Sequence, residues 1–219
     1  MEVNFISMSM KVLNIFIILF LSLILPSLAQ ERDNLRPIGY SFGKNRYHDE
    51  IRRILFDGIS EFQVIQYLIS PSFGGERVLV IEIDTATLNT FTIAYHESES
   101  NIFQSLGSKR SSEINVKKVR KPIQSDDVYS VMKLFNSALS TVCENNRVGI
   151  DGVSYYFSNM ARSGKTWKDG TNIGKDRISK LIEVCNQLIS TTKSNNQIVV
   201  MDKELKIEIE NLTEEFKSN

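Results

Sequence analysis

The two cysteines, Cys143 and Cys185, carry the most reactive side chains in this sequence. Each lies in a segment whose apolar residues repeat at helical spacing, and Cys185 falls on the apolar stripe of its segment. Two cysteines in an exported chain favour a disulfide between them. The alternative is that both thiols stay reduced and pack as small apolar side chains. We predict the disulfide, because the amino-terminal segment is typical of an exported protein.

The two histidines lie in short polar runs, at residues 48–50 and 96–99. Neighbouring residues of a helix point in different directions, so His48, Asp49 and Glu50 cannot surround one metal ion and are expected on the surface. His96 has acidic neighbours, but no second histidine or cysteine cluster accompanies it. Neither histidine belongs to a recognisable nucleophile or acid–base arrangement. We therefore expect no metal, no cofactor and no local catalytic motif.

Residues Ser163–Thr166 read Ser-Gly-Lys-Thr, like the end of a phosphate-binding loop. Such a loop also needs a glycine five residues before Gly164, where this sequence has Asn159. No helix-forming run follows directly, because Trp167 leads into Lys-Asp-Gly. The sequence therefore predicts a solvated turn here rather than a nucleotide site.

The elements that carry these residues are centred on the segment from Arg147 to Trp167, which predicts a β-hairpin between two helices. Asp151-Gly152 suits a strand reversal, because glycine reaches positive φ at little cost. Side chains alternate along a strand, so Tyr155 and Phe157 share one face, which we expect to be core. A polar turn is expected from Asn159 to Lys168.

The only tryptophan, Trp167, ends this hairpin. Either it is buried against the aromatic face, or it stands at an exposed rim as a ligand contact, because indole offers both apolar area and an N–H donor. Together with Arg162 and Lys165, Trp167 makes the polar turn one of two candidate interaction surfaces.

The order DGVSYYFS, SGKTW and then a helix with a cysteine, ISKLIEVCNQLI, resembles a family of small exported bacterial domains of unassigned function. The resemblance covers about residues 60–192 and implies a strand before the GKTW turn, but it carries no catalytic residue. The matching positions are Asp151, Gly152, Tyr155, Phe157, Gly164, Lys165 and Trp167.

The amino terminus predicts where the protein works. Lys11 precedes an apolar run from Val12 to Leu25, and Pro26–Ala29 then places small residues before Gln30. This pattern predicts a signal peptide over residues 1–29, cleaved between Ala29 and Gln30, and hence export to the periplasm or the medium. The run is shorter than the roughly 20 residues of a spanning helix, so no membrane span is expected after cleavage.

Bulk charge gives no support for nucleic-acid binding, because 26 Lys and Arg residues balance 26 Asp and Glu residues. The segment from Leu106 to Pro122 is locally basic, however, with only Glu113 opposing its cations. Such charge either keeps an edge strand from pairing with other chains or forms a patch for an acidic protein or envelope polymer. The cations of this second candidate surface are Lys109, Arg110, Lys117, Lys118, Arg120 and Lys121.

We expect an α+β fold, with an antiparallel sheet of about five strands and two amphipathic helices packed on one face. After the signal peptide, residues 30–60 are expected to be an irregular lead-in with a short helix near Tyr47–Phe56. Residues 61–195 form the α+β domain. Residues 196–219 form a tail that suits either a strand pair or a helix.

The sequence supports an exported binding or interaction module better than an enzyme. Its ligand is an unknown partner protein, which the module would neutralise, or an envelope polymer. The alternative is a hydrolase of envelope glycans or peptidoglycan, because carboxylates that meet only in the folded chain leave no local spacing. A structural role without a specific ligand is the third hypothesis.

Overall fold

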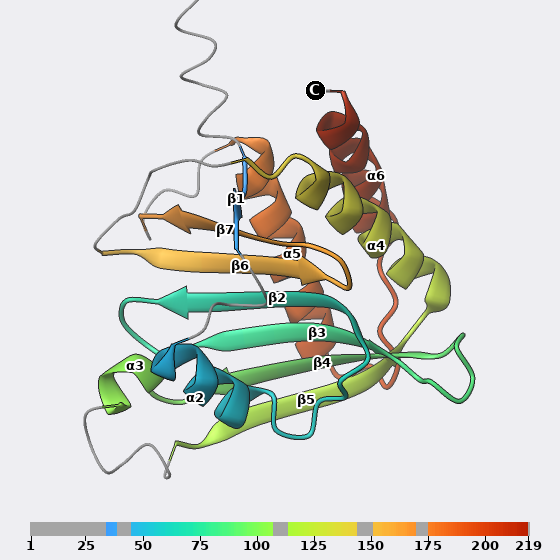
Figure 1. Cartoon of the computed structure of the whole chain (residues 1–219). Coiled ribbons are helices and arrows are strands. Elements are labelled where there is room, and N and C mark those ends of the chain that lie inside the picture. Colours follow the sequence, from blue (N-terminus) through green and yellow to red (C-terminus); the bar gives the residue numbers. More distant parts are fainter. Residues whose placement is uncertain (1–33, 39–44, 107–113, 144–150, 170–174, 219) are drawn as a thin grey trace, which may run out of the picture. The chain divides into compact units, whose positions relative to one another are not determined.

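Runs of β-branched and aromatic residues form one antiparallel sheet in the described part of the chain (Figure 1). The computed structural model describes residues 34–38, 45–106, 114–143, 151–169 and 175–218. From Leu35 onward these residues belong to one compact unit. Its strands follow the order β1-β7-β6-β2-β3-β4-β5, and all neighbours in the sheet are antiparallel. The strands are β1 (Arg36–Pro37), β2 (Gln63–Pro71), β3 (Arg77–Ile83), β4 (Phe91–Ser98), β5 (Val116–Ile123), β6 (Val153–Asn159) and β7 (Ser163–Lys168).

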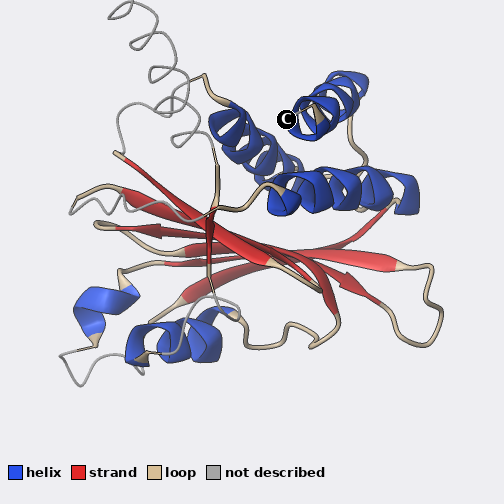
Figure 2. Cartoon of the chain, turned by 45° about the horizontal axis from the view of Figure 1, so that its top comes forward, coloured by secondary structure: helices blue, strands red, loops and turns tan. Residues whose placement is uncertain are grey.

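Helices cover both faces of this sheet (Figure 2). A short helix, α3, follows β4, and the longer helices each carry an apolar stripe. The described helices are α2 (Arg46–Leu55), α3 (Ile102–Ser105), α4 (Ser125–Ser140), α5 (Arg177–Lys193) and α6 (Lys203–Lys217).

The larger core lies between the sheet and α4, α5 and α6. Tyr67 of β2 and Phe157 of β6 project into it, with ring centroids 5.1 Å apart, and Phe135 of α4 packs against Phe157. Tyr155 lies in the same core. This confirms the prediction that Tyr155 and Phe157 share a core face.

The smaller core lies on the opposite face, beneath α2. Ile51 and Leu55 of α2 pack there with Leu68 of β2 and Tyr156 of β6. His96 of β4 also ties the helix to the sheet, because its Nδ1 lies 2.7 Å from the Leu55 carbonyl oxygen at the end of α2. The central strands are therefore buried on both faces.

The α+β class and the antiparallel sheet are confirmed, but the predicted counts are too low. The described residues form seven strands rather than about five, and five helices rather than two, with helices on both faces instead of one. The missed strand β1 has only two residues, Arg36 and Pro37, and carries no alternation that a sequence pattern could show.

The carboxyl-terminal tail is a helix, α6, which packs on α4 and α5. Its residues Leu205, Ile209, Leu212 and Phe216 are buried, as the helical alternative requires. Before it, Val199 makes an isolated parallel bridge to Ile123 of β5. The tail is thus part of the larger core.

The predicted signal peptide, its cleavage point at Ala29 and Gln30, and the basic residues Lys109 and Arg110 lie outside the described residues. Among the helices that the structure does describe, none is long and apolar enough to cross a membrane.

Candidate ligand-binding pocket

Both cysteines are free thiols in the structure, which does not contain the predicted disulfide. Next to Cys185, Asn186 accepts a hydrogen bond from Tyr67 of β2 at 3.5 Å. Cys143 instead donates its backbone N–H to Leu35, directly before β1.

His48 is buried, with only 8% of its surface exposed, so the prediction that it lies on the surface is wrong. Its ring stands edge-on to Tyr156, and its Nδ1 lies 2.8 Å from the Asn45 carboxamide oxygen. Burial, with the positive charges of Arg52 and Lys165, lowers the pKa of His48 to about 4. The residue is therefore a neutral ring that packs α2 on the sheet.

The acidic neighbours of His48 are surface residues, as expected, because Asp49 pairs with Arg52 and Glu50 pairs with Arg53 within one helical turn. No group of three or more potential metal-binding side chains occurs among the described residues.

The described part of the basic segment forms β5, which is an edge strand, as its charge pattern predicts. Its cations divide between the two faces of the sheet. Lys118 bonds Asp57 at 2.7 Å, and Arg120 pairs with Glu82, both on the α2 side. Lys117 and Lys121 point to the other side, where Lys121 donates to the carbonyl of Ser194. These four side chains do not form one continuous patch.

A hairpin of β6 and β7 is present, but its turn is at residues 160–162 and not at Asp151-Gly152, which precedes β6. The predicted solvated turn over Ser163–Thr166 is wrong, since Ser163–Lys168 is a strand. Trp167 lies opposite Ser154 and is half-buried on the α2 side, so it does not pack against Tyr155 and Phe157. Arg162 is exposed in the turn, and Lys165 is half-buried. This surface and β5 lie near opposite edges of the sheet.

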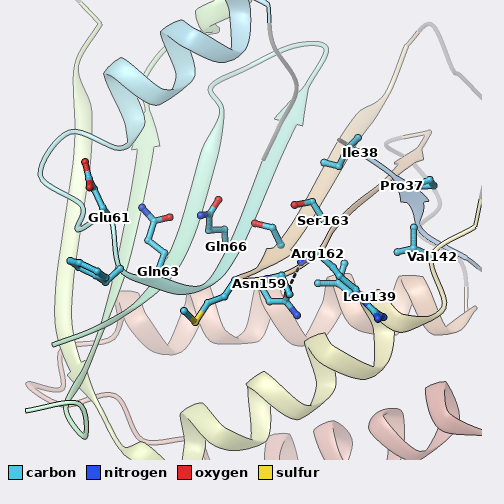
Figure 3. A pocket seen from close by; sticks show the side chains of 14 residues that line it. Pro37, Ile38, Glu61, Gln63, Gln66, Leu139, Val142, Asn159, Arg162 and Ser163 are labelled. Carbon is cyan, nitrogen blue, oxygen red and sulfur yellow. Dashed lines mark hydrogen bonds between the residues drawn. The ribbon is translucent and has the colours of Figure 1, made fainter. Parts of the chain in front are cut away.

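A pocket of about 790 Å³ lies where this turn meets the start of β2 (Figure 3). This size is ordinary for a site that binds a small ligand. The lining comes from the lead to β2, β2 itself, the β6–β7 turn, the residues after β1 and the end of α4. Its residues are Pro37, Ile38, Glu61, Phe62, Gln63, Gln66, Leu139, Val142, Ser158, Asn159, Met160, Ala161, Arg162 and Ser163.

A β-bulge aims two glutamine side chains into the pocket. Residues three apart on a regular strand would face opposite ways, but the register of β2 against β3 shifts between Gln63 and Ile65. Gln63 then lies opposite Glu82, and Gln66 lies opposite Val80, which share one face of β3. Figure 3 shows the two amides side by side.

Three residues that line this pocket each carry a buried side-chain oxygen without a hydrogen-bond partner among the described residues: Oε1 of Gln63, Oε1 of Gln66 and Oγ of Ser158. Ser158 is 1% exposed and lies directly opposite Gln66 in the β2–β6 pairing. Burying an unpaired polar atom is costly. Gln63, Gln66 and Ser158 therefore hold hydrogen-bonding capacity that the described part of the protein does not use.

A hydrogen bond within the protein determines how the carboxamide of Gln63 is oriented. Nε2 of Gln63 donates to the carbonyl of Ser60 at 2.7 Å, which leaves Oε1 as an acceptor in the pocket. Asn159 contributes no free group, because its carboxamide oxygen accepts from the N–H groups of Ala161 and Arg162 and its nitrogen bonds Asn136. Asn159 shapes the turn instead.

No protein family, curated protein or solved structure matches this chain. The function therefore has to be argued from the pocket and its surroundings.

The buried carboxylates of the described residues serve structural contacts. Glu76 accepts the N–H of Ile102 at 2.8 Å, and Asp127 accepts the N–H of Met201 at 2.7 Å. Glu76 directly precedes β3 and Glu82 lies within it, so the two residues are about 20 Å apart at the spacing of a strand. Asp127 belongs to α4, which packs on the opposite face of the sheet from α2. Glycosidase carboxylates stand about 5–10 Å apart, so these three do not fit that chemistry.

Sequence reasoning missed the pocket. The run around β2 predicts a strand, but nothing in it marks a bulge that turns Gln63 and Gln66 to one side. The only local sign is the pair of polar residues inside an otherwise apolar run. The polar turn predicted over Asn159–Lys168 contributes residues 159–163 to its lining, among them Arg162.

Proposed function

We propose that this chain is an exported binding module and that its ligand site is the pocket between β2 and the β6–β7 turn. The observation that supports the proposal is that three residues of one pocket lining, Gln63, Gln66 and Ser158, each carry a buried polar atom without a partner among the described residues. A concave site of this kind favours a small molecule or the end of a polymer over a flat protein partner.

The ligand class follows from the lining. Gln63 accepts a hydrogen bond, Ser158 can donate or accept, and neither is charged. Apolar side chains of Phe62 and Met160, both largely exposed, stand beside these polar groups. A ring with an apolar C–H face and hydroxyl groups around it would suit both the polar groups and the apolar side chains. We therefore propose a saccharide unit of an envelope polymer as the ligand.

The test is calorimetric titration of the purified protein with soluble mono- and disaccharides and with peptidoglycan fragments. Ser158→Ala and Gln66→Leu each remove one ligand contact, and each is expected to weaken binding about three- to tenfold. Ser130→Ala, on α4 away from the pocket, is the matched control and should bind normally.

Stability separates a binding role of Ser158 from a structural one. Its hydroxyl has no partner among the described residues, so Ser158→Ala should leave the melting temperature unchanged or raise it. Weaker binding together with unchanged or higher stability supports the proposal. Absence of saccharide binding, or binding that Ser158→Ala and Gln66→Leu leave intact, would overturn it.

A further inference from the structure

Two positive side chains face each other at the β1 edge of the sheet. Arg36 of β1 lies directly opposite Lys165 of β7, which places their Cβ atoms about 5 Å apart on one face. Both residues are half-buried. Like charges in directly opposed positions destabilise a strand pair, so this arrangement is costly for the protein alone.

Neither Arg36 nor Lys165 forms an ion pair with an acidic side chain among the described residues. Burial, and then the charge of Arg36, lowers the pKa of Lys165. Tyr156 lies directly opposite Lys165 on β6, and burial raises the pKa of its hydroxyl. His48, on which the charge of Lys165 acts, is neutral.

This pair of cations adjoins the proposed pocket. Ser163, two residues before Lys165 on the same face of β7, lines the pocket, and so do Pro37 and Ile38, which follow Arg36. Two residues along a strand span about 7 Å, which is close to the length of a sugar ring with its substituents. A ligand that fills the pocket can thus reach both cations.

We infer that Arg36 and Lys165 bind an oxyanion and that the ligand of the pocket is an acidic saccharide, with its carboxylate or phosphate between these two side chains. The inference rests on the proposed function for the saccharide part, but the anion site can be tested separately. Guanidinium and ammonium groups both form strong, charge-assisted hydrogen bonds with oxyanions.

The first experiment titrates the whole protein with inorganic phosphate against sodium chloride of equal ionic strength, with amide shifts of β1 and β7 and the melting temperature as readouts. Phosphate should shift these amides and raise the melting temperature. Lys165→Gln and Arg36→Gln should each weaken phosphate binding at least about tenfold and raise stability in chloride, because repulsion is relieved. Lys133→Gln, an exposed charge change on α4, should keep the wild-type response.

The second experiment compares galacturonate with galactose and glucose 6-phosphate with glucose. Tighter binding of the acidic sugar in either pair, lost in Lys165→Gln, supports the inference and identifies the acidic group. Equal binding of acidic and neutral sugars would overturn the inference that the ligand is acidic, while the proposal that the pocket binds a saccharide would stand. Phosphate binding without any sugar binding would support the anion site and overturn the saccharide assignment. Phosphate binding that Lys165→Gln and Arg36→Gln leave unchanged would overturn the anion site.

Discussion

Arg120 of β5 forms an ion pair with Glu82 of β3, whose side chain is only 2% exposed. The carboxylate also accepts the N–H of Ser60 at 3.1 Å, so the pair fastens the loop before β2 to the sheet. Arg120, which the sequence places in a candidate binding surface, thus stabilises the fold through its contact with Glu82.

Replacing Arg120 should therefore destabilise the protein. Arg120→Glu leaves the buried Glu82 carboxylate without its counter-charge, and we expect a loss of about 2–4 kcal/mol in the free energy of unfolding. Lys117→Glu is the control, because Lys117 is 71% exposed and 3.9 Å from Glu99, and it should change stability by less than about 1 kcal/mol. Urea unfolding measures both, and equal effects would contradict the structural role of Arg120.

Glu76 is expected to be another stabilising residue. Its fully buried carboxylate accepts hydrogen bonds from the Tyr47 hydroxyl and the Ile102 N–H, which join α2 and α3 to the sheet. Glu76→Ala leaves these donors unpaired and should cost about 3 kcal/mol in urea unfolding. Glu210→Ala, an exposed change on α6, should stay near wild type. Similar stability of the two variants would show that Glu76 is dispensable.

Stability should fall as the pH drops below neutral. His48 has a pKa near 4 in the folded protein and about 6.5 when unfolded, so the unfolded chain binds the proton first. The contribution is fully present above pH 6.5 and is lost as the pH falls from there to 4, with a slope of up to about 1.4 kcal/mol per pH unit. Urea unfolding at several pH values measures this slope, which His48→Gln should reduce. The same slope in both proteins would mean that His48 titrates normally.

The two thiols should differ in reactivity. Cys185 is fully buried, and burial raises its pKa, whereas Cys143 is partly exposed. We expect a thiol reagent to label Cys143 in the folded protein and to label Cys185 only after unfolding. Cys143→Ser should abolish the labelling of the folded protein and keep the labelling after unfolding. A wild-type protein with no free thiol after unfolding would instead establish the disulfide that the sequence predicts.

Much of the local structure was predictable because it depends on neighbouring residues. The repeat that includes Val131 and Phe135 predicts α4, and the one that includes Ile178 and Leu181 predicts α5.

The binding surfaces were less predictable, because local charge says nothing about partners that lie far away in the sequence. Lys118 is one of several cations in a basic run, but its partner Asp57 belongs to the loop after α2. His48 looks like a surface residue because of its acidic neighbours, yet its own position on α2 faces Tyr156.

The sequence by itself determined the α+β class, the helices α4 and α5, the strand β6 and the pattern that predicts export, since periodicity acts over a few neighbouring positions. Tertiary structure alone decided that Gln66 meets Ser158 and that Arg36 meets Lys165. Each of these pairs joins distant parts of the chain through strand register, and register is set by the packing of the whole sheet.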